Sequence, residues 1–158
     1  MPHLHTLNAQ KPNAIDSPGD SENGRVSAIV LLVDDDDLTL QTTANLLVAN
    51  GLQVVTANGA KQAIQILGES SKISCVVTDL SMPQFSGKWL AKQIAVRWPQ
   101  LPVVLYSGCV DSGVDLQDAK VAHFVQKPFK AEEFIRLLRE TIESRGLQSP
   151  EMSHSPTV

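Results

Sequence analysis

Five polar side chains that could do chemistry stand where apolar segments of this chain stop. They are Asp34, Asp35, Asp79, Ser107 and Lys127. The two adjacent aspartates follow one apolar segment, and each of the other three side chains follows a segment of its own. If these segments are parallel strands, their carboxyl ends share one edge of a sheet, so three carboxylates, a hydroxyl and an amine would meet there.

Such a set has a chemical logic. Carboxylates crowded within a few ångströms raise one another's pKa unless a cation lies among them. Magnesium prefers hard oxygen ligands, usually one or two carboxylates together with waters and a phosphoryl oxygen. A carboxylate left free beside the ion can attack a phosphoryl group and form an acyl phosphate. The ammonium and the hydroxyl would contact the transferred oxygens, so the set predicts magnesium-dependent phosphoryl transfer to an aspartate.

The elements that must hold these side chains follow from an alternation of short apolar runs with amphipathic stretches. This alternation predicts repeated strand–helix units on a parallel sheet, and therefore an α/β fold. The first run is continuously apolar, as in a parallel strand that is covered on both faces. The five expected strands are 28–33, 53–57, 74–78, 102–106 and 123–125.

Apolar residues at helical spacing lie between the expected strands and after the last one. The expected core faces are Leu40, Ala44, Leu47 and Val48; Ala60, Ala63, Ile64 and Leu67; Leu90, Ile94 and Trp98; and Phe134, Ile135, Leu138 and Ile142. Gly51, Gly68 and Pro99 are expected to end the first three helices. A further helix is expected between Ser112 and Ala122, where the periodicity is weakest.

Composition excludes several functional classes. The chain has 158 residues, 42% of them apolar, which fits one ordinary domain with loose ends. Thirteen Lys and Arg against seventeen Asp and Glu give a net charge of −4, so no basic surface for nucleic acid is expected.

The longest apolar run is too short to span a membrane, and no secretory signal is visible at the start. Cys75 and Cys109 have neither zinc nor disulfide-framework spacing, and we expect a cytoplasmic protein.

Four short motifs surround the polar side chains named above. They are Ile29-Val-Leu-Leu-Val-Asp-Asp-Asp36, Val76-Val-Thr-Asp-Leu-Ser-Met-Pro83 with Gly87, Val103-Val-Leu-Tyr-Ser-Gly108, and Phe124-Val-Gln-Lys-Pro-Phe129. In this order and spacing they resemble the receiver domain of response regulators in two-component phosphorelays. The resemblance implies a flavodoxin-like, doubly wound (βα)5 fold with a five-stranded parallel sheet in strand order 2-1-3-4-5. The expected organisation is a disordered arm at 1–25, a receiver domain at 26–145 and a disordered tail at 146–158.

The resemblance also implies a role for each residue of the acidic site. Asp79 looks like the phosphoacceptor and Asp35 like a direct magnesium ligand, with Asp34 supporting the ion, often through water. The backbone carbonyl of Ser81 would complete the protein ligands. Lys127 resembles the family's lysine, whose following peptide bond to Pro128 is cis.

Two further residues resemble the family's switch. Ser107 corresponds to the hydroxyl that turns toward the phosphoryl group, and Phe124 to the aromatic side chain that rotates with it. The chain departs from the family pattern at Ser86, which stands in place of an acid, and between Ser107 and Lys127, where it is a couple of residues shorter.

The resemblance implies protein partners rather than a substrate. A histidine kinase or a histidine phosphotransfer protein would phosphorylate Asp79, and the switch would change a face that binds a downstream protein target. The chain would then be a self-phosphorylating phosphoprotein and not an enzyme; phosphorylation-dependent dimerisation is left open. Residues 146–158 are too few for an output domain, so we expect a stand-alone regulator, a relay shuttle or the receiver section of a hybrid histidine kinase.

Two alternatives come from different classes. The sequence from Asp35 to Thr39 fits the D-x-D-x-T opening of haloacid-dehalogenase-type phosphatases, with Asp35 as nucleophile and Asp37 as acid/base. That reading needs further acidic metal ligands downstream of the lysine, and the acids that come first after Lys127, Glu132 and Glu133, fall well inside an expected helix. The other alternative is a degenerate receiver that serves purely as an interaction module. A simpler account of Asp36 and Asp37 is that they are first-turn residues favoured by the helix dipole.

Overall fold

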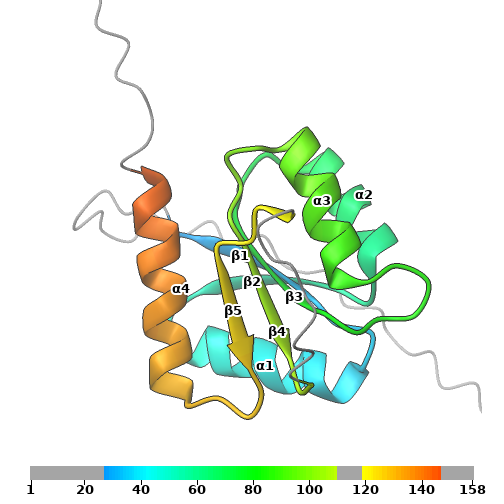
Figure 1. The fold of residues 1–158 in the computed structure, drawn as a ribbon. Coiled ribbons are helices and arrows are strands. Elements are labelled where there is room, and N and C mark those ends of the chain that lie inside the picture. Colours follow the sequence, from blue (N-terminus) through cyan, green and yellow to red (C-terminus); the bar gives the residue numbers. More distant parts are fainter. Residues whose placement is uncertain (1–26, 110–118, 147–158) are drawn as a thin grey trace, which may run out of the picture.

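The computed structural model describes residues 27–109 and 119–146, and the statements below concern these residues. Five strands form one parallel sheet in the order β2-β1-β3-β4-β5 (Figure 1). The strands are β1 (Ile29–Val33), β2 (Gln53–Ala57), β3 (Ile73–Asp79), β4 (Val103–Ser107) and β5 (His123–Gln126). The expected α/β fold and its strand order are confirmed.

Four helices cover the sheet within the described residues. They are α1 (Asp37–Ala49), α2 (Ala60–Glu69), α3 (Gly87–Arg97) and α4 (Ala131–Gly146). Figure 1 shows α1 and α4 on one face and α2 and α3 on the other. The helix expected between Ser112 and Ala122 lies mostly outside the described residues, as do the expected arm and tail, so these stay predictions. The last helix extends through Gly146, one residue into the expected tail.

Each face of the sheet has its own hydrophobic core. Successive side chains of a strand point to opposite faces, so the continuous apolar run of β1 supplies both cores. Val30 and Leu32 pack with Leu47 of α1 and Phe134 of α4. On the opposite face, Leu31 and Val33 of β1 pack with Ala63 of α2 and Leu90 of α3. The sheet is thereby fixed between two helical layers.

Two expectations about the helices were wrong in detail. Val48 was expected on the core face of α1, but it is 58% exposed, and the buried residues are Leu40, Thr43 and Leu47. Because successive residues turn by about 100° around a helix, a face centred near Leu47 leaves Val48 beyond its edge. Gly68 does not end α2, which continues to Glu69. Gly51, with φ of +82°, does follow the end of α1 as expected.

The pairing of β1 with β3 contains one irregularity. Ile29 lies opposite Ile73, but Val30 lies opposite Cys75, so Ser74 is an extra residue in β3. The Ile29 amide donates to Ser74 Oγ at 3.3 Å, and Arg145 of α4 donates to the carbonyls of Ile73 (2.8 Å) and Ser74 (3.3 Å). Beyond this point the register is regular from Val30 opposite Cys75 to Val33 opposite Thr78.

Candidate metal centre

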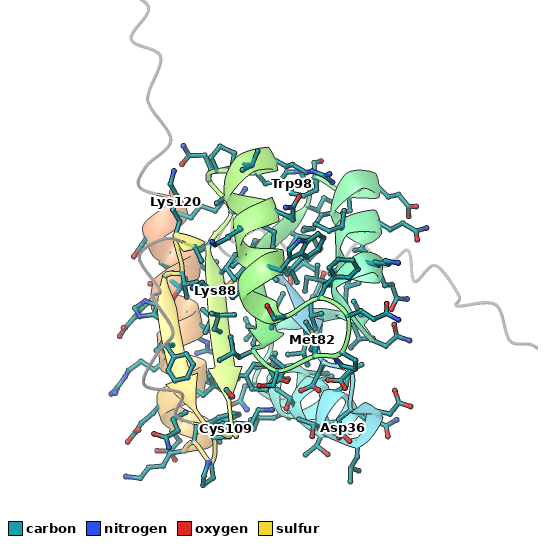
Figure 2. The ribbon with its side chains drawn as sticks, turned by 45° about the vertical axis from the view of Figure 1, so that its right-hand side comes forward. Asp36, Met82, Lys88, Trp98, Cys109 and Lys120 are labelled. Atoms are coloured by element: carbon teal, nitrogen blue, oxygen red, sulfur yellow. The ribbon has the colours of Figure 1, made fainter. Side chains whose placement is uncertain are left out.

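The predicted site lies at the carboxyl ends of β1 and β3, which are neighbours in the sheet. Figure 2 shows the labelled Asp36 and Cys109, which flank the predicted site residues, at the same end of the molecule and opposite to Trp98 and Lys120. One carboxylate oxygen each from Asp34, Asp35 and Asp79 lies within 4.8 Å of the others. Two adjacent strands therefore bring together the three aspartates that the sequence placed at one edge.

Asp34 is 2% exposed, and both of its carboxylate oxygens accept hydrogen bonds. Its Oδ1 accepts from the Asp36 amide at 2.9 Å, and its Oδ2 accepts from the Tyr106 hydroxyl at 2.6 Å. Asp35, in contrast, is exposed. Asp34 is thus held in place by the protein, whereas the carboxylate of Asp35 stays accessible to an ion from solvent.

Asp79 is 8% exposed and lies at the end of β3. Burial raises the pKa of its carboxyl group, and the charges of Asp34 and Asp35 raise it further, while Lys127 opposes the change. A cation among the three carboxylates would relieve both the burial and the repulsion. All three donors are hard oxygens, so the donor set fits magnesium.

Lys127 provides the positive charge of the described site. Its Nζ lies 3.4 Å from Asp79 Oδ1 and 3.5 Å from Asp34 Oδ2, and 4.0 Å from the centre of the Tyr106 ring. The Lys127 amide donates to the Ser107 carbonyl at 2.8 Å, which fixes the end of β5 against β4. The peptide bond to Pro128 is cis, as the resemblance implied.

The predicted switch residues lie on neighbouring strands. Ser107 is buried at the end of β4, and its Oγ accepts a hydrogen bond from the Cys109 amide at 3.2 Å. Phe124 is half-buried in β5, opposite Leu105 in the ladder. Ser81, the predicted carbonyl ligand, is exposed in the loop between β3 and α3. These positions are compatible with the predicted roles, which stay predictions.

The amino end of α3 closes tightly against Asp79. A Cβ atom at Gly87 would lie 2.1 Å from the Asp79 carbonyl oxygen, so only glycine fits this approach. The Gly87 amide donates to the Leu80 carbonyl at 3.0 Å. Ser86, which stands in place of the family's acid, caps α3 by accepting from the Trp89 amide at 3.2 Å.

The remaining acidic candidates have structural roles. Asp36 caps α1 by accepting from the Thr39 amide at 2.7 Å, which lowers the pKa of its carboxyl group. Asp37 lies in the first turn of α1, and Glu132 and Glu133 lie in the first turn of α4. None of these last three belongs to the acidic cluster found among the described residues, so the geometry gives no support to the phosphatase alternative.

Tyr106 is the site residue that the sequence analysis missed. It stands in an apolar strand directly before Ser107 and is the chain's only tyrosine. A single hydroxyl in such a strand is the signal that could have drawn attention to it, because a buried hydroxyl normally finds a partner.

Comparisons with known proteins agree with this geometry. The family description "Response regulator receiver domain" matches residues 30–139. The chain is similar to response regulator protein FleR of Pseudomonas aeruginosa, with 32% identity over 115 residues, which are 72% of this chain and 24% of that protein. It is also similar to transcriptional regulatory protein FixJ of Azorhizobium caulinodans, with 31% identity over 115 residues, or 72% of this chain and 54% of that protein.

Solved structures give the same result. A response regulator receiver domain protein from Clostridium thermocellum has a TM-score of 0.72 and 26% identity, covering 76% of this chain and 98% of the other. A CheY-like receiver domain protein from Methanospirillum hungatei has a TM-score of 0.71, 19% identity, and coverage of 77% and 98%; it shows the fold alone.

The curated relatives named above are longer than the region that matches this chain. The chain spans about a quarter of FleR and just over half of FixJ. Among the described residues, no helix has the length and apolar character needed to cross a membrane.

Proposed function

The chain belongs to the family of response regulator receiver domains of two-component systems, and from this premise we propose that Asp79 accepts a phosphoryl group. The donor is a phosphohistidine of a histidine kinase or of a histidine phosphotransfer protein. The observation that carries the proposal is the joint position of Asp79 with the carboxylates of Asp34 and Asp35 and with the ammonium of Lys127.

In the proposed reaction, a carboxylate oxygen of Asp79 attacks the phosphorus atom. An O–P bond forms, the P–N bond of the phosphohistidine breaks, and the imidazole leaves with the electron pair and takes up a proton. The ammonium of Lys127 neutralises charge on the phosphoryl oxygens. Asp35 and Asp79, with the carbonyl of Ser81 and the support of Asp34, would hold a magnesium ion, which would supply further charge neutralisation.

Phosphorylation of Asp79 changes the protein surface through residues of β4 and β5. Ser107 turns toward the phosphoryl group and Phe124 rotates, and together they change the surface that a downstream protein binds. In this proposal the side chains of Ser81 and Cys109 flank the path of the hydrolytic water and are the candidates for tuning the lifetime of the acyl phosphate. The chain is thus a phosphoprotein of the cytoplasm that autodephosphorylates, rather than an enzyme acting on other substrates.

Acetyl phosphate with magnesium tests the proposal on the full chain. Phosphate incorporation, measured by phosphate-affinity gel electrophoresis, should be stoichiometric in the wild type and absent in Asp79→Asn. Asp35→Asn should label far more slowly. Asp37→Asn is the matched control, because it removes the same charge from an exposed first-turn residue and should label like the wild type.

The same protein preparations separate the alternatives. Turnover of a phosphomonoester that disappears in Asp35→Asn but persists in Asp79→Asn would overturn the proposal in favour of the phosphatase. A wild type that neither binds magnesium nor becomes labelled would instead indicate a receiver fold used only for interaction.

A further inference from the structure

Lys127 occupies an unusual middle position between two carboxylates. Its Nζ is almost equidistant from Asp34 and Asp79, at 3.5 and 3.4 Å. Charge-assisted hydrogen bonds between an ammonium and a carboxylate are commonly about 2.7–2.9 Å long. The ammonium is therefore not tightly paired with either aspartate, although Asp34 is the more deeply buried of the two anions.

The Tyr106 hydroxyl supplies the hydrogen-bond donor that Asp34 would otherwise take from the Lys127 ammonium. Its hydroxyl donates to Asp34 Oδ2 at 2.6 Å, the same oxygen that faces the ammonium. The Asp36 amide already donates to Oδ1. Because both oxygens of the buried carboxylate have a short hydrogen bond, the ammonium need not approach it closely.

The tyrosine reaches this oxygen from a strand that does not adjoin Asp34. Tyr106 lies in β4, which is separated from β1 by β3. Its side chain is completely buried on the face covered by α1 and α4. Burial raises the pKa of its hydroxyl, and the bond to Asp34 raises it further, so the hydroxyl keeps its proton and serves as a donor. The face of the ring also lies beneath the ammonium of Lys127.

We propose that Tyr106 is a positioning residue: its hydroxyl donates a hydrogen bond to the Asp34 carboxylate and thereby keeps the Lys127 ammonium available to Asp79. This inference rests on the proposed function, because availability to Asp79 matters only if that carboxylate reacts. Without the hydroxyl, the buried Asp34 Oδ2 keeps only its long contact with Lys127 Nζ at 3.5 Å. The ammonium then moves toward Asp34 and away from the phosphoryl acceptor.

Tyr106→Phe tests the proposal, because it removes the hydroxyl and keeps the ring that contacts Lys127. The rate of labelling by acetyl phosphate at saturating magnesium should fall about tenfold, the lower end of what a hydrogen bond to a charged group is worth. Thr43→Val is the matched control, since it removes another buried hydroxyl, from α1, whose presence lowers the pKa of Tyr106. That variant leaves the bond to Asp34 and should keep the wild-type rate within about twofold.

A double-mutant cycle distinguishes positioning from mere packing. In Asp34→Asn the neutral amide cannot capture the ammonium, so adding Tyr106→Phe should change the labelling rate by less than about twofold. A structural role of the hydroxyl would instead give the same loss in both backgrounds. That additive result, or an unchanged rate in the single variant, would overturn the proposal.

A second measurement does not depend on labelling or on the stability of a tyrosine variant. Since the chain has one tyrosine, 3-fluorotyrosine labels position 106 alone, and one ¹⁹F resonance reports on its hydroxyl. This resonance should shift in magnesium-free Asp34→Asn and stay in place in Asp37→Asn. An unshifted resonance in Asp34→Asn means that the hydrogen bond is absent and refutes the inference. Failure of the wild type to accept phosphate, by contrast, would refute the proposed function itself.

Discussion

Substitution of Gly87 by alanine is expected to damage the site through the backbone. The new Cβ would lie 2.1 Å from the Asp79 carbonyl oxygen and 3.0 Å from Leu105 Cδ2. A relaxed C···O contact is about 3.3 Å, so α3 and the end of β3 must separate by roughly 1 Å. Such overpacking costs about 1–3 kcal/mol of unfolding free energy, and the better helix propensity of alanine offsets at most about 1 kcal/mol of it.

Urea unfolding of Gly87→Ala and Gly68→Ala measures this effect against a matched control. Gly68 is also helical, but a Cβ there meets nothing within 4 Å, so its replacement should stabilise the protein by about 0.5–1 kcal/mol. Gly87→Ala should lose about 1–2 kcal/mol and, with Asp79 displaced by roughly 1 Å, up to about a hundredfold in labelling rate. Equal stability of the two variants together with full labelling would refute the close packing of α3 on Asp79.

Three further predictions test burial and charge. In EDTA at neutral pH, Asp79→Asn should raise the unfolding free energy measured by urea titration. Burial raises the pKa of the Asp79 carboxyl, so the wild-type folded state loses stability as pH rises through that pKa. The advantage of the variant should therefore vanish below the ordinary pKa of 3.8. Burial raises the pKa of the Cys75 thiol to about 12, so a thiol reagent should titrate only the exposed Cys109 until the chain unfolds. Phe134→Ala should cost about 3–5 kcal/mol of unfolding free energy, whereas Val96→Ala, at an 81% exposed position, should stay within about 0.5 kcal/mol.

The parallel sheet and the shared edge of its polar side chains were predictable because both depend on local signals, whereas the strand order was implied only by the resemblance to receiver domains. Continuous apolar runs indicate strands covered on both faces, and polar side chains directly after them fall at one edge. Asp34, Asp35 and Asp79 therefore fall at the same edge, and they come within 4.8 Å of one another because β1 and β3 are neighbours in the sheet. Their chemical roles are a separate matter, which the labelling experiments decide.

Other features could not be read from the sequence because they depend on tertiary contacts. The exposure of Val48 depends on the rotation of α1 against the sheet, and helical spacing alone does not fix this rotation. The extra residue at Ser74 depends on how two strands pair, which no local pattern marks. Tyr106 resembles a packing residue within an apolar run, and its bond to Asp34 spans 72 positions in the sequence.

The irregular pairing at Ser74 gives Arg145 an influence far from where it lies. Adding or removing one residue in a strand turns every later side chain to the opposite side. The guanidinium of Arg145 donates hydrogen bonds to the carbonyls of Ile73 and of the extra residue Ser74, near the start of β3. Arg145, in the last turn of α4, thus stabilises the backbone at the point that sets which way the later side chains of β3 face, including Asp79 at its end.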